Sequence, residues 1–297
     1  MDLFKVSRPQ LDKLISCALL HGGDYADLYF EHTTAFNLLL KDGAVSSGGF
    51  HTDYGVGIRV LKGEKTGYAY SENTEMDDMM KAAQAASAIA LGTKGNRTYS
   101  PVQDRRHDIH PMERNWRDFG ADAFLPFLQD LEKEILGRDN RIVKVIARLS
   151  DSVTEVMMFN SLGELTCDTR PLGSVSVSAV FVQDGKTENR NASRSFRMGA
   201  ELIGPSLIKE LADDLVKGID ARFEARRPKG GQMSVVMGAG ASGILLHEAM
   251  GHAFEADFNR KGQSIFSDKL GKRVWSYRFN IVIADIAHNL RKLIVHP

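Results

Sequence analysis

Short turn signals between strand-like stretches constrain the fold of this chain more than any other feature. Asp42-Gly43, Lys62-Gly63-Glu64 and Asn160-Ser161-Leu162-Gly163 each follow or separate stretches rich in β-branched, aromatic and aliphatic residues. Such turns join neighbouring antiparallel strands. The sequence therefore predicts antiparallel pairing among strands at 26–31, 36–41, 55–60, 66–70, 141–149, 153–159 and 175–183.

Helical patterns occur among these strands. Thr74 is expected to cap the second helix at its N-terminus, and Pro126 to lie in the first turn of the third. Residues 92–118 show little periodicity and are interpreted as an extended loop or linker. The mixture of helices and antiparallel hairpins indicates an α+β fold. The expected helices span 11–19, 74–91, 126–136 and 206–225.

A break rich in charge and glycine, 226–231, suggests a domain boundary. The chain has 297 residues, enough for two domains. We therefore expect an N-terminal domain of helices and antiparallel sheet at 1–227 and a second, incomplete domain at 228–297.

Composition excludes several classes of protein. The 38 Lys and Arg residues balance 38 Asp and Glu residues, so the chain lacks the basic excess expected of a protein that contacts nucleic acid directly. No apolar stretch is long enough to span a bilayer, and the N-terminus lacks the order of features found in a secretory signal. Two cysteines cannot build a disulfide framework, so a reducing, cytoplasmic setting is expected.

The most specific stretch lies between Met233 and Asp257. It predicts a strand at 234–237, a glycine turn at 238–243 and a helix from about residue 244. Gly238, Gly240 and Gly243 have the spacing of a dinucleotide-binding turn, and Asp257 follows at a suitable distance. However, the residues before Asp257 do not form a β-branched run that would carry it on a second strand. We therefore favour a tight structural turn over a nucleotide site.

His247, Glu248 and His252 form an HExxxH sequence on the predicted helix. It resembles the zinc-peptidase signature HExxH, in which two histidines hold Zn²⁺ and the glutamate is the general base, but has one extra residue. On a regular α-helix, residues five apart lie about 140° apart around the axis. A π-bulge would bring both rings together, so we expect distortion at Met250–His252. Glu255 is a candidate partner for these side chains.

The segment 245–257, together with 55–60, 67–70 and 160–163, resembles the TldD/PmbA family of metallopeptidases, on its TldD side, over roughly residues 10–274. The resemblance implies Zn²⁺ held by His247 and His252, with Glu248 as general base. It also implies cleavage of short or unfolded peptides that bind as an added strand. Implied partners are a second copy of the chain, or a TldE/PmbA-like subunit. An older family label is modulator of DNA gyrase, and the zero net charge offers no support for direct contact with DNA.

The chain departs from the family pattern in one respect. Family members continue into a β-rich C-terminal domain that supplies a cysteine as third zinc ligand, whereas here the resemblance fades from Trp275. Residues 228–297 are therefore expected to be the start of such a β-rich domain, carrying the HExxxH helix. Neither Cys17 nor Cys167 occupies a matching place, Cys167 is interpreted as a small buried apolar residue, and His288 is a conceivable substitute. We expect a truncated or frame-shifted product. The alternative function is a catalytically inactive fragment, or a module that binds peptides or dimerises. An uncovered apolar face at 233–257 would favour association.

Overall fold

The computed structural model describes residues 1–90, 109–227, 229–234, 236, 242–269 and 271–272, and the backbone of 103–107. These residues fall into two compact units, Met1–Ala225 and a second that begins at Arg226. The first unit combines helices with a large sheet, which confirms the α+β class.

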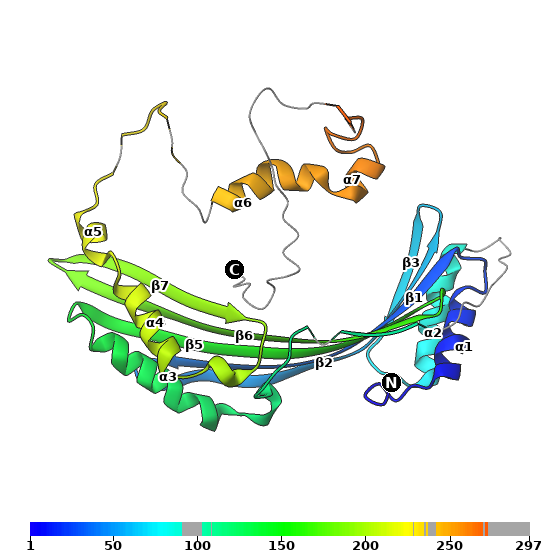
Figure 1. The fold of residues 1–297 in the computed structure, drawn as a ribbon, viewed down its shortest axis with the longest axis horizontal. Helices are drawn as coiled ribbons and strands as arrows, with labels where there is room; N and C mark the ends of the chain where they lie inside the picture. Colours follow the sequence, from blue (N-terminus) through cyan, green and yellow to red (C-terminus); the bar gives the residue numbers. More distant parts are fainter. Residues whose placement is uncertain are drawn as a thin grey trace. The chain divides into compact units, whose positions relative to one another are not determined.

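The described strands of the first unit form one seven-stranded sheet (Figure 1). Its main path has the order β3-β2-β1-β5-β6-β4, and β7 also pairs with β6. All pairs are antiparallel except β4 with β6. β4 lies along the first part of β6 and β7 along the rest. The strands are β1 (Tyr25–Lys41), β2 (Ala44–Lys62), β3 (Lys65–Ser71), β4 (Gln103–His107), β5 (Ile142–Asn160), β6 (Glu164–Gln183) and β7 (Lys186–Phe196).

The predicted turns are confirmed, but the strands are longer than expected. Asp42, Gly43, Gly63 and Gly163 all have positive φ angles in the connections between strands. β1 runs without a break through both 26–31 and 36–41, because β2 and β5 pair with it along its length. β5 likewise joins the two strands predicted at 141–149 and 153–159. Pairing on both sides keeps the polar middle of each strand extended.

Two groups of helices cover the two ends of the sheet. α1 (Arg8–Ala18) and α2 (Met76–Ser87) pack over one end, and α3 (Ala121–Leu136) and α4 (Pro205–Val216) over the other (Figure 1). The buried residues of β1 in both cores are even-numbered, from Ala26 to Leu40. Successive side chains of a strand alternate between faces. Both groups therefore cover the same face, and the odd-numbered residues of β1 lie on the opposite, open face.

Each core is built from large, fully buried apolar side chains. Trp116, in the 3₁₀ turn η2 (Trp116–Asp118), is 1% exposed, and its indole nitrogen donates to the Met198 carbonyl at 2.8 Å. The fully buried residues include Leu11, Leu14, Leu28, Phe30, Ile58 and Met79 in one core, and Leu38, Leu40, Leu128, Leu131, Phe181 and Leu211 in the other.

Several predicted helix boundaries are wrong. The Thr74 hydroxyl pairs with that of Tyr54 at 2.9 Å, and Glu75 is the N-cap of α2, which continues into η1 (Ala88–Ala90). Pro126 lies inside α3, five residues after the helix begins at Ala121. The stripe at 206–225 is two helices, since Gly218, with φ of 74°, separates α4 from α5 (Ile219–Glu224).

The loop predicted at 92–118 contains β4 and η2, while residues 91–102 and 108 lie outside the described part of the chain. β7 was not predicted, because its sequence is mostly polar and only a paired edge makes it a strand. A short 3₁₀ turn, η3 (Ala200–Leu202), follows it.

The described residues of the second unit are helical or irregular. They form α6 (Ser242–Leu246), a π-helical turn η4 (His247–Gly251), a 3₁₀ turn η5 (His252–Phe254) and α7 (Ala256–Arg260). Ser234 and Val236, within the predicted strand 234–237, are not in a strand. The β-rich character expected of this region is not seen in the part that the structure describes. Among the described residues, no helix has the length and apolar character needed to cross a membrane.

Candidate metal centre

A π-helical turn brings His247 and His252 together. Their ring centroids lie 4.5 Å apart, with the ring planes at 64°. The backbone N–H of His252 donates to the carbonyl of His247, five residues earlier, which is the bond that defines a π-turn. The distortion expected from the spacing is therefore present, although it begins at His247 rather than at Met250.

Glu248 joins the two histidines in a cluster of possible metal ligands. One ligand atom from each of His247, Glu248 and His252 can be chosen so that all three lie within 4.8 Å of one another. Oε2 of Glu248 lies 3.6 Å from Nε2 of His252. All three side chains are exposed, so a ligand can reach them from solvent. Two imidazole nitrogens and a carboxylate are donor atoms that zinc accepts.

Glu255 holds the other nitrogen of the His252 ring. Its Oε1 lies 2.6 Å from Nδ1 of His252, and this bond raises the pKa of the imidazole. A carboxylate on one imidazole nitrogen fixes the ring orientation and leaves the other nitrogen available to a metal. Glu255 therefore contacts His252, the pairing for which the sequence made it a candidate.

Side chains that sequence analysis did not single out hold the segment after His252 against the backbone of Ala253. The Ser264 hydroxyl and the Asn259 amide both donate to the carbonyl of Ala253, at 2.5 and 2.8 Å. The rings of Phe254 and Phe266 stack with centroids 4.7 Å apart. Serine and asparagine in a short polar segment carry no distinctive signal, so only the folded arrangement shows this role.

The glycine motif gains no support as a nucleotide site. Gly238 and Gly240 lie outside the described residues, and Gly243 lies within α6. Asp257 lies in the first turn of α7, whereas a dinucleotide fold would place this acid at the end of a second strand.

The other candidate ligands do not join the cluster. Cys17 is buried in α1 and Cys167 is half-buried in β6, less than expected, and neither forms a disulfide. Neither belongs to the metal-ligand cluster found among the described residues. His288 lies outside the part of the chain that the structure describes.

Exposed apolar side chains gather in the described part of the second unit. Neither α6 nor α7 buries a residue, and Val236 is 98% exposed. The sequence predicted an uncovered apolar face on a strand and helix at 233–257. The described residues show the exposed apolar side chains without the strand. The other large exposed residues of this region are Met233, Ile244, Leu245, Leu246, Phe254, Phe258 and Ile265.

Two histidines and a glutamate brought together on a distorted helix are typical of a metallopeptidase, and they make this chain a candidate for that class. The chain belongs to the PmbA/TldD metallopeptidase family. Three family domains match in order: domain 1 at residues 26–90, the central domain at 114–225 and the C-terminal domain at 230–289. The last match extends past residue 274, where the resemblance was expected to fade.

Similar proteins agree with this assignment. A Metalloprotease TldD homolog from Haemophilus influenzae is 34% identical over 280 residues, which cover 90% of this chain and 57% of the relative. A Metalloprotease TldD homolog from Buchnera aphidicola subsp. Schizaphis graminum is 30% identical, with 91% and 58% covered. The chain therefore spans a little over half the length of these relatives.

Solved structures show the same fold at low sequence identity. TldE from Thermococcus kodakarensis superposes with a TM-score of 0.66 at 13% identity, covering 88% of this chain and 58% of that one. A candidate modulator of DNA gyrase from Thermotoga maritima gives a TM-score of 0.65 at 17% identity, covering 89% and 59%.

Proposed function

We propose that the complete protein is a zinc-dependent peptidase of the TldD type. The observation that carries this proposal is the π-turn, which brings His247 and His252 together with Glu248 despite their unusual spacing. A regular helix would have placed the two rings on different faces. The family match supports a metal ion, and the donor atoms favour zinc.

In this proposal, His247 and His252 hold the metal and Glu255 keeps the His252 ring in position. Bound zinc would supply a Lewis acid that polarises a peptide carbonyl and the attacking water. Glu248 would accept the proton of that water and deliver it to the leaving amine. The Glu248 carboxylate lies beside His252. Among the described residues, no Lys or Arg pairs with it.

The substrate and partners proposed are those implied by the family resemblance. They are short or unfolded peptides, and either a second copy of the chain or a TldE/PmbA-like subunit. The likeness to the solved TldE structure is a likeness of fold, and the proposed TldE/PmbA-like partner rests on the family resemblance. We also propose that 1–227 is the N-terminal domain and that 228–297 belongs to the C-terminal domain, in a protein of the reducing cytoplasm.

The test measures zinc per chain in the purified protein beside His252→Ala and Glu248→Gln. We expect near-stoichiometric zinc in the parent chain, a large loss in His252→Ala and retention in Glu248→Gln. With zinc bound, Glu248→Gln should cleave unfolded peptides far more slowly than the parent. Equal zinc in the parent and His252→Ala would contradict the assigned ligands, and equal cleavage by Glu248→Gln would contradict the assigned base.

A second candidate is a catalytically silent module that binds peptides or dimerises. The observation that favours it is that all three clustered side chains are exposed and that the described residues supply no cysteine to them. Two imidazoles hold zinc more weakly than a three-ligand protein site. Peptide binding without zinc and without cleavage would support this candidate.

A further inference from the structure

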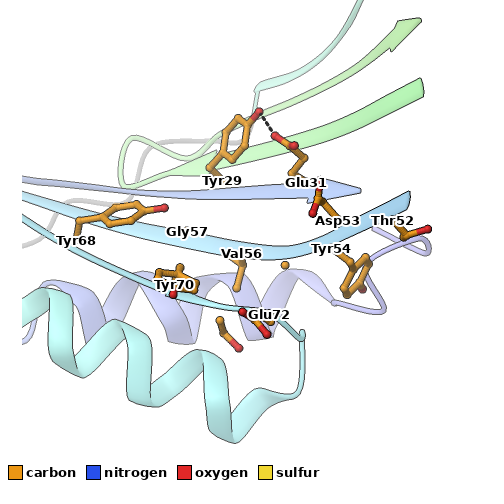
Figure 2. A pocket seen from close by; sticks show the side chains of 12 residues that line it. Tyr29, Glu31, Thr52, Asp53, Tyr54, Val56, Gly57, Tyr68, Tyr70 and Glu72 are labelled. Carbon is orange, nitrogen blue, oxygen red and sulfur yellow. Dashed lines mark hydrogen bonds between the residues drawn. The ribbon is translucent and has the colours of Figure 1, made fainter. Parts of the chain in front are cut away.

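A trough crosses the open face of the sheet in the first unit, on β1, β2 and β3. Gly57 of β2 lies between Tyr29 of β1 and Tyr70 of β3 in the strand register, and Gly55 lies beside Glu31. Figure 2 shows these side chains around the pocket, which has a volume of about 580 Å³. We call it the tyrosine trough, and its central residues are Tyr29, Glu31, Gly55, Gly57, Tyr68 and Tyr70.

The floor of the trough is the backbone of β2, and the Tyr68 hydroxyl lies against it at Gly57. A Cβ atom at Gly57 would lie 2.7 Å from the hydroxyl oxygen of Tyr68, and one at Gly55 would lie 2.4 Å from the carbonyl oxygen of Ser71. β1 and β3 are separated by two strand spacings, about 9.5 Å. Because Gly57 has no side chain, the Tyr68 ring can reach across β2 toward Tyr29, and the pocket lies beside these rings.

The rings that form the outer wall are presented to solvent. Tyr68 is 65% exposed and Tyr70 is 68% exposed. Single exposed aromatic residues are ordinary on protein surfaces. Here, however, two lie together on a short edge strand, and a third, Tyr29, lies in the same register row as Gly57 and Tyr70. Aromatic faces carry partial negative charge and attract cations.

A carboxylate is fixed at the inner wall without a cationic partner. The hydroxyl of Tyr29 donates to one oxygen of Glu31 at 2.8 Å (Figure 2). The hydroxyl of Thr33 donates to the other oxygen at 3.0 Å. Among the described residues, neither Glu31 nor Glu72, at the outer end of the pocket, makes an ion pair. The pocket lining contains three carboxylates and no lysine, arginine or histidine.

The charges next to the trough are already paired. Arg170 of β6 interacts with the Tyr29 hydroxyl, but its Nε lies 2.6 Å from Oδ2 of Asp168. On the adjacent row of the sheet, Arg59 pairs with the buried Asp27. Asp53, the third acid of the lining, pairs with His51 at 2.9 Å. Among the described residues, the three acids of the lining, Glu31, Asp53 and Glu72, therefore have no Lys or Arg partner beside the aromatic walls.

We propose that the tyrosine trough binds a guanidinium or alkylammonium group. The planar or extended cation lies against the exposed tyrosine rings, and the Glu31 carboxylate accepts its N–H groups. The carboxylate is oriented beforehand by two hydroxyls, so binding requires little rearrangement. The site lies in the first unit, and this proposal does not depend on the metal cluster or on peptidase activity.

The same cation can come from two sources, a free small amine or guanidine, or a lysine or arginine side chain of an extended peptide. Probes distinguish them. Nuclear magnetic resonance titration of the full chain would use Nα-acetyl-arginine methylamide, n-butylguanidinium and the blocked tripeptide acetyl-Gly-Arg-Gly amide. The neutral analogue Nα-acetyl-citrulline methylamide has nearly the same shape without the charge. Tighter binding of the tripeptide indicates a peptide side chain, and equal binding of n-butylguanidinium indicates a free cation.

Variants then locate the binding. Tyr70→Leu and Glu31→Gln should each weaken binding of the arginine probe by about threefold to tenfold, while Tyr70→Phe keeps the aromatic face and should change it less than about twofold. Phe50→Leu, at an exposed aromatic of β2 outside the lining, and Glu64→Gln, in the β2–β3 turn, are the matched controls.

Equal affinity for the citrulline and arginine probes would overturn the proposal, as would unchanged affinity in Glu31→Gln and Tyr70→Leu. A loss in Glu248→Gln alone would move the binding to the metal cluster and would also overturn it. Thermal melting curves that match the parent would show that the variants fold.

Discussion

Oε1 of Glu255 lies 2.6 Å from Nδ1 of His252, at the end of the π-turn that holds the candidate metal ligands. The opposite nitrogen, Nε2, faces Glu248 at 3.6 Å. Glu255 therefore contacts one ring nitrogen of His252, and Glu248 lies near the other. Because α6 and α7 bury no residue, local contacts of this kind set the geometry of the cluster.

We predict that Glu255→Gln weakens zinc binding by about tenfold to a hundredfold, since acids that support a ligating histidine commonly have effects of this size. Glutamine can still accept a hydrogen bond, but it lacks the charge that makes the imidazole a better ligand. Asp257→Asn is the matched control, because Asp257 lies in the same region without a contact to His252. Competition with a chromogenic chelator gives both affinities. An unchanged zinc affinity in Glu255→Gln would remove the supporting role from Glu255.

Gly251 allows the ring of His247 to lie against the π-turn. A Cβ atom here would lie 3.2 Å from Nδ1 of His247, and alanine also favours a regular α-helix over glycine by about 1 kcal/mol. Both effects should move the two rings apart, so Gly251→Ala should weaken zinc binding by about tenfold. Gly243→Ala, at a helical glycine with open space around it, should leave zinc affinity unchanged. The same loss in both variants would show that the effect is not specific to the π-turn.

Asp151 makes the stability of the first unit depend on pH. It lies on the covered face of β5 between Leu149 and Val153, is 9% exposed, and its Oδ2 has no hydrogen-bond partner. Burial raises its pKa from 3.8 to about 7. The folded state therefore holds this proton between about pH 4 and 7 while the unfolded chain releases it, so stability falls as pH rises through that window.

The asparagine variant isolates this contribution. Between pH 4 and 8, the free energy of unfolding of the parent should fall, relative to Asp151→Asn, by on the order of 4 kcal/mol. Asp151→Asn should be the more stable protein at pH 8 and lose its advantage near pH 4. Parallel stability curves for the two proteins, from chemical denaturation at several pH values, would contradict the buried, unpaired state of Asp151.

The hairpins and the α+β class could be predicted from sequence because turn residues act locally. Asp42-Gly43 and Gly63 adopt positive φ angles wherever the chain turns, so their signal survives folding. The lengths of the strands could not be predicted in this way, because they depend on pairing between distant segments. β7 is a strand only because the edge of β6 pairs with it, and its polar sequence gives no period to detect.

The meeting of His247 and His252 could be predicted for a different reason. The spacing of His247 and His252 conflicted with a regular helix, and a π-turn was a structure that reconciled a shared site with that spacing. The tyrosine trough gave no such signal, because Tyr29, Gly57 and Tyr70 meet only through the register of three strands. Short sequence motifs do not reveal sites whose residues come together only through strand pairing.

Gly67 allows β3, which carries the outer wall of the trough, to pack closely on α2. A Cβ atom here would lie 2.1 Å from the carbonyl oxygen of Ala86 and 2.8 Å from the Ile89 side chain. The helix backbone cannot give way as a flexible side chain can, so Gly67→Ala should destabilise the first unit by about 1–3 kcal/mol. Gly49→Ala, on β2 with nothing within 4 Å, is the control and should change stability little. Thermal melts of both variants measure the difference, and equal melting temperatures would contradict the close approach of β3 to α2.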